Sequence, residues 1–126
     1  MISMRRFLLA LLAGLLLTIG AMAAEPMAIA VESAEAGLDE FTGQPLVNVR
    51  WSAEGQRAFA LFTADHVGKR VDLMVGKEVV TSPVVQTVLD MRDIQITGLV
   101  SLAEARDIAG RLTGKKARLF VRLARD

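Results

Sequence analysis

Residues 46–81, with the sequence LVNVRWSAEGQRAFALFTADHVGKRVDLMVGKEVVT, contain the clearest structural pattern in this chain. From Leu46 to Trp51, apolar and polar side chains alternate, which predicts a strand with one buried face. Ser52 stands where it can cap a helix predicted over Ala53–His66. Residues 71–81 then alternate again on both sides of a short turn. A strand, a helix and a hairpin in this order indicate an α+β fold.

The hairpin is predicted from Gly76-Lys77, which separates the alternating segments Val71–Val75 and Glu78–Thr81. Glycine at the first position of a two-residue turn fits type II′, because glycine takes a positive φ at little cost. Pro83 follows, and it either ends the pairing or restricts it to an edge, since proline has no N–H to donate. Val79–Val85 is therefore the candidate edge of the sheet.

The remaining segments extend this pattern in both directions. A second helix begins at Ser101, where Ser101 and Glu104 form a capping box, and its apolar stripe ends before Gly114. Its stripe consists of Leu102, Ala105, Ile108, Ala109 and Leu112. Strands are predicted at Met27–Val31, Ile94–Ile96 and Arg118–Leu123, and a loop at Ala34–Pro45. The simplest arrangement is a ferredoxin-like sandwich, with two helices on a mainly antiparallel sheet and an extra N-terminal strand.

The N-terminus has the three-part pattern of a secretory signal peptide. Arg5 and Arg6 precede the uncharged run Phe7–Ile19, and small residues follow at Ala21 and Ala23. The run is shorter than the roughly 20 residues of a membrane span. We therefore expect residues 1–23 to be cleaved, leaving residues 24–126 as a single periplasmic domain without a transmembrane helix. An uncleaved membrane anchor is the alternative.

The composition argues against most enzyme classes and against nucleic-acid binding. The chain has 126 residues, with 15 Lys+Arg, 14 Asp+Glu, one His, no Cys and no Tyr. The absence of cysteine excludes disulfides and thiolate metal sites, and the balanced charge gives no electrostatic case for nucleic acid. We predict no catalytic, cofactor-binding or metal-binding residues. His66, the one imidazole, is explained by a favourable interaction with a helix C-terminus.

Two surfaces are candidates for partner binding. The first is the predicted edge, with residues Val79, Val80, Thr81, Ser82, Pro83 and Val84. The second is one face of the last strand, where Arg118, Phe120 and Arg122 alternate in a pattern suited to an anionic partner. Alternatively, Phe120 packs beneath the first helix and leaves the arginines exposed. Trp51 is expected in the core.

A series of short motifs carries a family resemblance. His66-Val67-Gly68-Lys69-Arg70, Ser82-Pro83-Val84, Ile94-Gln95-Ile96-Thr97-Gly98 and Glu104-Ala105 follow one another in order. This set resembles the head subdomain of the first periplasmic domain of SecD, the protein-export membrane subunit also found fused as SecDF. The resemblance runs from about Val47 to Leu112.

The sequence upstream of these motifs adds to the resemblance, and several positions depart from it. Ala30–Val49 looks like the opening hairpin of that subdomain. Gly76-Lys77 stands where the family usually has Asp-Gly, and Asp72 takes a strand position usually held by a small or apolar residue. The resemblance covers none of the family's membrane helices.

The resemblance implies a freestanding, secreted, non-enzymatic binding module. Its partner would be an unfolded preprotein or a subunit of the Sec translocon, met at the outer face of the inner membrane. The physical route would be addition of a partner strand to the exposed sheet edge. One alternative is a periplasmic interaction or structural protein that reuses the head fold without an export role. Another is a membrane-surface protein held by the N-terminus or the basic last strand.

Overall fold

The computed structural model describes residues 25–125, and the predicted signal peptide at residues 1–23 lies outside the described residues. The elements of the described part are β1 (Met27–Leu38), β2 (Pro45–Trp51), α2 (Ala53–Ala64), β3 (Val71–Val75), β4 (Glu78–Thr81), β5 (Asp93–Ile96), α3 (Leu102–Arg111) and β6 (Arg118–Leu123). None of the helices within residues 25–125 is long and apolar enough to cross a membrane.

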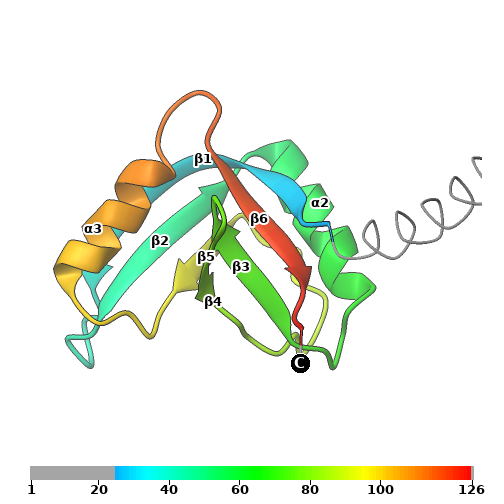
Figure 1. The fold of residues 1–126 in the computed structure, drawn as a ribbon, viewed down its shortest axis with the longest axis horizontal. Helices are drawn as coiled ribbons and strands as arrows, with labels where there is room; N and C mark the ends of the chain where they lie inside the picture. The colour runs from blue at the N-terminus through cyan, green and yellow to red at the C-terminus, as the bar shows by residue number, and fades with distance from the viewer. Residues whose placement is uncertain (1–24, 126) are drawn as a thin grey trace, which may run out of the picture.

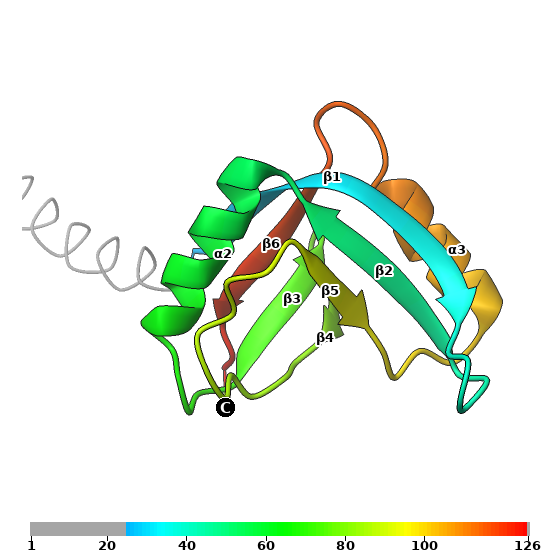
Figure 2. The same cartoon turned by 180° about the vertical axis from the view of Figure 1, so that it is seen from behind.

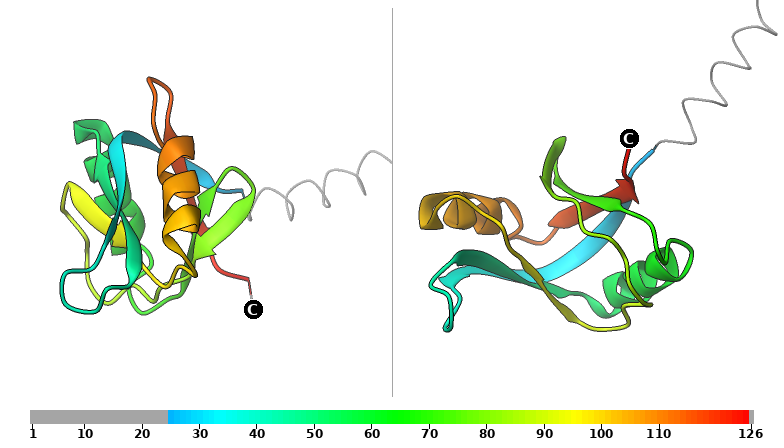
Figure 3. Two further views of the ribbon diagram at one scale, coloured as in Figure 1. Left: turned by 90° about the vertical axis from the view of Figure 1, so that its left-hand side faces the viewer. Right: turned by 90° about the horizontal axis from the view of Figure 1, so that it is seen from below.

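One curled sheet forms the body of the domain. Its strand order is β4-β3-β6-β1-β2-β5, and each pair of neighbours is antiparallel. Seen from below, the sheet bends around the core, with α2 and α3 at opposite ends (Figures 1 and 3). The predicted α+β class, with two helices on an antiparallel sheet, is confirmed. The finer assignment to a ferredoxin-like sandwich stays a prediction.

The first strand joins the two halves of this sheet. Met27–Ala30 pairs with β6, whereas Val31–Leu38 pairs with β2. The register shifts between Val31 and Ser33, which is where β1 passes from one partner to the other. A bulge of this kind bends a strand and increases its twist. We call the β4, β3 and β6 side the β4 half and the β2 and β5 side the β5 half (Figure 2).

The alternating strand pattern from Leu46 to Trp51 is confirmed. Val47, Val49 and Trp51 are fully buried on one face of β2, and the Trp51 ring lies 5.0 Å from the ring of Phe59 on α2. Trp51 therefore has the core position that the sequence predicted. Ser52 caps α2 as expected, because its Oγ accepts a hydrogen bond of 3.0 Å from the N–H of Gly55.

Gly55 is the point where α2 touches β1. A Cβ atom at this position would lie 2.3 Å from the carbonyl oxygen of Ala30, closer than real Cβ contacts. The same carbonyl accepts a hydrogen bond of 3.1 Å from the N–H of Ser52. The helix is thus docked on the stretch of β1 where the strand changes partners, and glycine is required there by the close approach of two backbones.

The predicted loop at Ala34–Pro45 is wrong in its first part. β1 continues to Leu38, and only Asp39–Gln44 form the turn before β2 begins at Pro45. The small residues of this stretch fit a strand because Ala36 pairs with Val47 and Gly37 pairs with Leu46. Tertiary pairing with β2 therefore overrides the turn preference of the isolated segment. The opening hairpin expected from the family resemblance is present.

The first helix ends earlier than predicted. It stops at Ala64 rather than His66, and Val67, just beyond the predicted end, is exposed. Thr63 is buried: its hydroxyl donates to the Ala60 carbonyl at 3.0 Å and accepts from the N–H of Leu89 at 2.9 Å. Its two hydrogen bonds offset the cost of removing the hydroxyl from water, and hydrophobic periodicity does not detect a buried polar residue of this kind.

The second helix follows the prediction with one change at its cap. Ala105, Ile108, Ala109 and Leu112 are buried, and Ser101 Oγ accepts from the N–H of Glu104 at 3.1 Å. The Glu104 carboxylate, however, accepts from the N–H of Val100 at 3.2 Å, one residue before the expected partner. The helix start is therefore satisfied by both side chains, in a variant of the capping box.

Candidate functional site

The structure confirms that the segment predicted as an edge, which contains β4, lies at an edge of the sheet. β4 has β3 as its single neighbour in the strand order. Gly76 has a φ of +61° in the two-residue turn that joins β3 to β4, as the predicted turn requires. The side chains of Val79 and Val84 are 41% and 47% exposed, whereas Val85 at the end of the predicted segment is buried in the core. Val79 and Val84 are thus the apolar side chains that this edge offers to a partner.

The edge is short and irregular. Met74 pairs with Val79 and Leu73 with Thr81, so Val80 is an extra residue that bulges the strand. Past β4, the Pro83 carbonyl accepts from the N–H of Val71 at 2.9 Å, and a single bridge joins Val84 to Arg70. Bulges and prolines are devices that limit uncontrolled strand addition at an edge. A partner strand would therefore find a short stretch of free backbone.

Ser82 and Arg122, both candidate binding residues, meet at Asp72. The Ser82 hydroxyl donates to Asp72 Oδ1 at 2.7 Å, and Arg122 Nε donates to Asp72 Oδ2 at 3.0 Å. Asp72 is only 7% exposed. The sequence marked Asp72 as unusual for a strand, but neither of its partners could be identified from periodicity. The three side chains link the chain just beyond β4 to β3 and β6, so they hold the β4 half together.

Phe120 lies on the outer face of the sheet. It pairs with Met74 of β3 and Ala28 of β1, whereas its neighbours Leu119 and Val121 are fully buried in the core on the opposite face. Packing beneath the first helix, the alternative considered for Phe120, is therefore wrong, because that helix adds Phe59 and Phe62 to the core side. Phe120 is half-buried and Arg118 is exposed.

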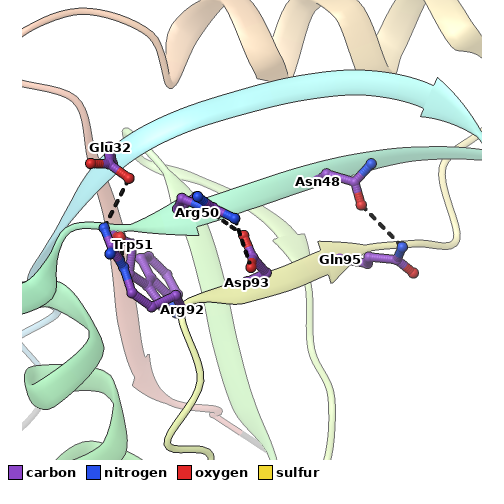
Figure 4. A network of polar contacts seen from close by, with 7 residues as sticks. All are labelled: Glu32, Asn48, Arg50, Trp51, Arg92, Asp93 and Gln95. Atoms are coloured by element: carbon purple, nitrogen blue, oxygen red, sulfur yellow. Dashed lines mark hydrogen bonds and ion pairs between the residues drawn. The ribbon is translucent and has the colours of Figure 1, made fainter.

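Polar side chains form a ladder on the outer face of the β5 half (Figure 4). Gln95 Nε2 donates to Asn48 Oδ1 at 3.0 Å. One step along, Arg50 donates from Nε and Nη2 to the two carboxylate oxygens of Asp93, at 2.9 and 3.2 Å. These pairs join β2 to β5 at consecutive outward positions, and all four side chains are exposed. Sequence reasoning missed this ladder, although the alternation of Leu46–Trp51 placed Asn48 and Arg50 on one face.

A third pair extends the ladder toward β1. Arg92 donates from Nη2 to Glu32 at 2.9 Å and from Nε to the carbonyl of Trp51 at 3.1 Å. The N–H of Trp51 in turn donates to the Arg92 carbonyl at 2.7 Å. The hydrogen bond from Arg50 lowers the pKa of Asp93 from its ordinary value, and the same bond raises the pKa of Arg50. The Arg50–Asp93 and Arg92–Glu32 pairs are exposed to solvent, so salt screens the attraction within each pair.

Two hollows lie along this face and share Asn48. The first has a volume of about 240 Å³ and is lined at the tip of the β1–β2 hairpin by Leu38, Phe41 and Leu46. The second, also about 240 Å³, continues over Glu35 and Arg50. Together they form a shallow groove along β2, apolar at the hairpin tip and polar farther on. We call it the hairpin groove.

The described residues offer no arrangement typical of a metal site. Within residues 25–125, no three His, Cys, Asp or Glu side chains lie together closely enough to hold a metal ion. His66 Nδ1 donates to the Phe62 carbonyl at 2.7 Å, and its ring stacks on Phe62 with centroids 4.2 Å apart. The imidazole therefore satisfies a carbonyl in the last turn of α2, which is the role that the sequence predicted.

Comparisons with known proteins give a consistent result. Residues 25–115 match the family model described as SecDF, P1 head subdomain. The chain is 37% identical over 79 residues to the protein translocase subunit SecD of Aquifex aeolicus, covering 63% of this chain and 15% of the relative. It is 34% identical over 80 residues to SecD of Dictyoglomus turgidum, covering 64% of this chain and 20% of the relative.

The solved structures agree with these matches. A structure described as a membrane component SecDF that enhances protein export superposes with a TM-score of 0.64 and 29% identity, over 77% of this chain and 44% of that one. SecDF in its super-membrane-facing form superposes with a TM-score of 0.62, over 75% of this chain and 13% of that one. The chain belongs to the SecDF P1 head subdomain family, and it spans a fifth or less of the SecD relatives quoted above.

Proposed function

We propose that this member of the SecDF P1 head subdomain family is a periplasmic contact module in protein export. The family match over residues 25–115 carries the proposal. Its relatives are protein translocase subunits, and one solved relative is described as enhancing protein export. From these relatives we infer only the process in which this chain takes part, which is protein export. The proposal assigns to this chain a contact with a preprotein segment or with a translocon subunit, and no catalytic step.

The contact proposed for the β4 half is main-chain pairing at β4. An extended segment that adds to a sheet edge is held mainly by backbone hydrogen bonds, so many different sequences can bind. This mode suits a module that meets many exported chains. Val79 and Val84 provide exposed apolar surface beside the edge, and the Ser82–Asp72–Arg122 cluster keeps it in place. The bulge at Val80 limits the paired length, which favours weak and reversible contacts.

In-cell photo-crosslinking tests this proposal. Val79 and Val84 are replaced one at a time by a photo-reactive phenylalanine analogue, and the control position is Leu61, an exposed residue of α2. We expect adducts with Sec subunits or newly exported chains from the two β4-edge positions, and none from Leu61. Equal labelling at all three positions would argue against an edge contact.

The identity of the crosslinked partner also tests the export role. A single periplasmic protein with no part in export, recovered from both edge positions, would contradict it. The head fold would then serve an unrelated partner, because a shared fold does not imply a shared function.

A further inference from the structure

The hairpin groove has a floor and a rim of different chemistry. Leu46 lies on its floor and is only 4% exposed, although it occupies an outward position of β2. Phe41 stands at the hairpin tip and is 95% exposed. Large aromatic residues at interfaces contribute much of the binding free energy when they become buried there. The tip end of the groove is therefore suited to an apolar side chain.

The turn that carries Phe41 is held in one conformation by hydrogen bonds. Asp39 Oδ1 accepts from the N–H groups of Phe41 and Thr42, at 2.8 and 3.0 Å. The Asp39 backbone adds bonds of 2.8 Å to Gln44 and to Gly43. An ordered turn loses little conformational entropy on binding, so an exposed Phe41 is presented in advance of any partner.

The groove is acidic. Four carboxylates line its two hollows, those of Glu35, Asp39, Glu40 and Asp93, against one guanidinium, that of Arg50. Arg50 is bound to Asp93, and within residues 25–125 neither Glu35 nor Glu40 forms a salt bridge. Backbone hydrogen bonds from Thr42 and Phe41 lower the pKa of Asp39, which keeps it ionised. The charge of the groove therefore selects a cationic partner.

The side chains along the groove have the same spacing as the side chains on one face of an extended peptide. Leu46, Asn48 and Arg50 occupy alternate positions of β2, and Glu35 pairs with Asn48 across β1. An extended peptide also directs alternate side chains to one face, about 6.6 Å apart. An apolar side chain over Leu46 thus places the next inward-facing side chains near Glu35 on one side and near Glu40 on the other. The amides of Asn48 and Gln95, which lie level with Glu35 in the sheet, can bond to a peptide backbone.

We infer that the hairpin groove binds extended polypeptide segments in which an apolar residue is flanked, two positions away on either side, by lysine or arginine. The inference rests on the proposed function in taking a polypeptide as the partner. It goes further by locating a second contact in the β5 half and by naming the side chains that this contact prefers. Binding here depends on charge, whereas strand addition at β4 does not.

Fluorescence anisotropy with two labelled peptides tests the inference on the whole protein. The cationic probe is a short Ser/Gly peptide with a central leucine and a lysine at the second position on either side, and the anionic probe has glutamates in place of both lysines. We expect the cationic probe to bind at least about fivefold more tightly. Raising the salt concentration should reduce this preference, because the groove charges are exposed.

Paired charge reversals identify the binding face. Glu35→Lys with Glu40→Lys should remove the preference for the cationic probe. The control is Asp65→Lys with Asp107→Lys, which changes the net charge equally but places it at the exposed C-cap of α2 and on the exposed face of α3. Retention of the preference in the groove variant, or an equal loss in both variants, would overturn the inference.

The outcomes separate this inference from the proposed function. Equal binding of both probes, weakened by Val79→Pro at the β4 edge but not by the groove reversals, would reject the groove and leave the export contact standing. Failure of the wild-type protein to bind either probe would also reject the groove. The export role itself is judged by the in-cell crosslinks.

Discussion

The outward-facing side chains of the two halves of the sheet differ in how deeply they are buried. In the β4 half, all five residues of β3 are buried, and the charged pair Asp72–Arg122 is largely removed from solvent. In the β5 half, the outward residues Asn48 and Arg50 of β2 are exposed, and so is the outward pair Arg50–Asp93. The outward side chains of β3 are thus committed to the fold, which leaves the backbone edge of β4 and the exposed valines beside it for partners. The β5 half keeps its polar side chains available for contact.

The largest effect is expected where the two halves meet. Gly55→Ala would place a methyl group against the Ala30 carbonyl and push α2 away from β1, so we expect a loss of about 3 kcal/mol in the free energy of unfolding. Urea unfolding followed by the fluorescence of Trp51 measures it. The control is Gly110→Ala in α3, where a Cβ meets nothing within 4 Å and the helix should gain up to about 1 kcal/mol. Equal effects of the two substitutions would contradict this account of the junction.

The same substitution in each half tests the difference between the two ion pairs. Arg122→Ala leaves the Asp72 carboxylate poorly solvated without its cation, and we expect a loss of about 2 kcal/mol, below the usual cost for a fully buried pair because Arg122 is partly exposed. Arg50→Ala removes one partner of a solvent-exposed surface pair and should lower the free energy of unfolding clearly less than Arg122→Ala does. Comparable losses in urea unfolding would remove the distinction between the halves.

The Asp39 turn gives a prediction about pH. Hydrogen bonds in the folded state lower the pKa of Asp39 below its ordinary value of 3.8. The stability contributed by the ionised carboxylate is therefore present above that value and is lost as the pH falls through the lower folded pKa. Asp39→Asn keeps an acceptor oxygen but cannot ionise. Its urea midpoint should fall less steeply than that of the wild type when the pH is lowered below about 4. Parallel pH profiles would contradict the assigned role.

The smallest effect on stability is expected at the hairpin tip. Phe41 is almost fully exposed, so Phe41→Ser should change the free energy of unfolding by less than about 0.5 kcal/mol. The same variant should weaken binding of the cationic peptide, because it removes the aromatic wall of the groove. A large loss of stability would show that Phe41 belongs to the core. Unchanged binding would show that the tip takes no part in the groove.

Local patterns predicted most elements of the fold. Alternation identified β2, β3 and β6, and capping residues identified both helices, because these signals come from neighbours in sequence. The end of β1 was missed because Ala36 and Gly37 become strand residues only through their pairing with β2. The burial of Asp72 was missed because its partners, Ser82 and Arg122, are distant in the chain.

The candidate sites were predictable to a smaller extent. Pro83 marked the β4 edge correctly, because a missing N–H is a property of one residue. Arg118, Phe120 and Arg122 were grouped by their spacing, but Arg122 is bound to Asp72 and its charge is already paired. The hairpin groove brings together residues of β1, β2 and β5, whose order in the sheet no local pattern reveals.

Hydrogen–deuterium exchange on the whole protein, measured with each of the two peptides at one concentration close to the Kd of the cationic peptide, tests the division between the halves most directly. Protection at β4 should be the same for both peptides, because strand addition uses the backbone alone. Protection of the turn at residues 39–44 and of β5 should be clearly stronger with the cationic peptide. Equal protection of the β5 half by both peptides, or charge-dependent protection at β4, would contradict the assignment of backbone contacts to one half and side-chain contacts to the other.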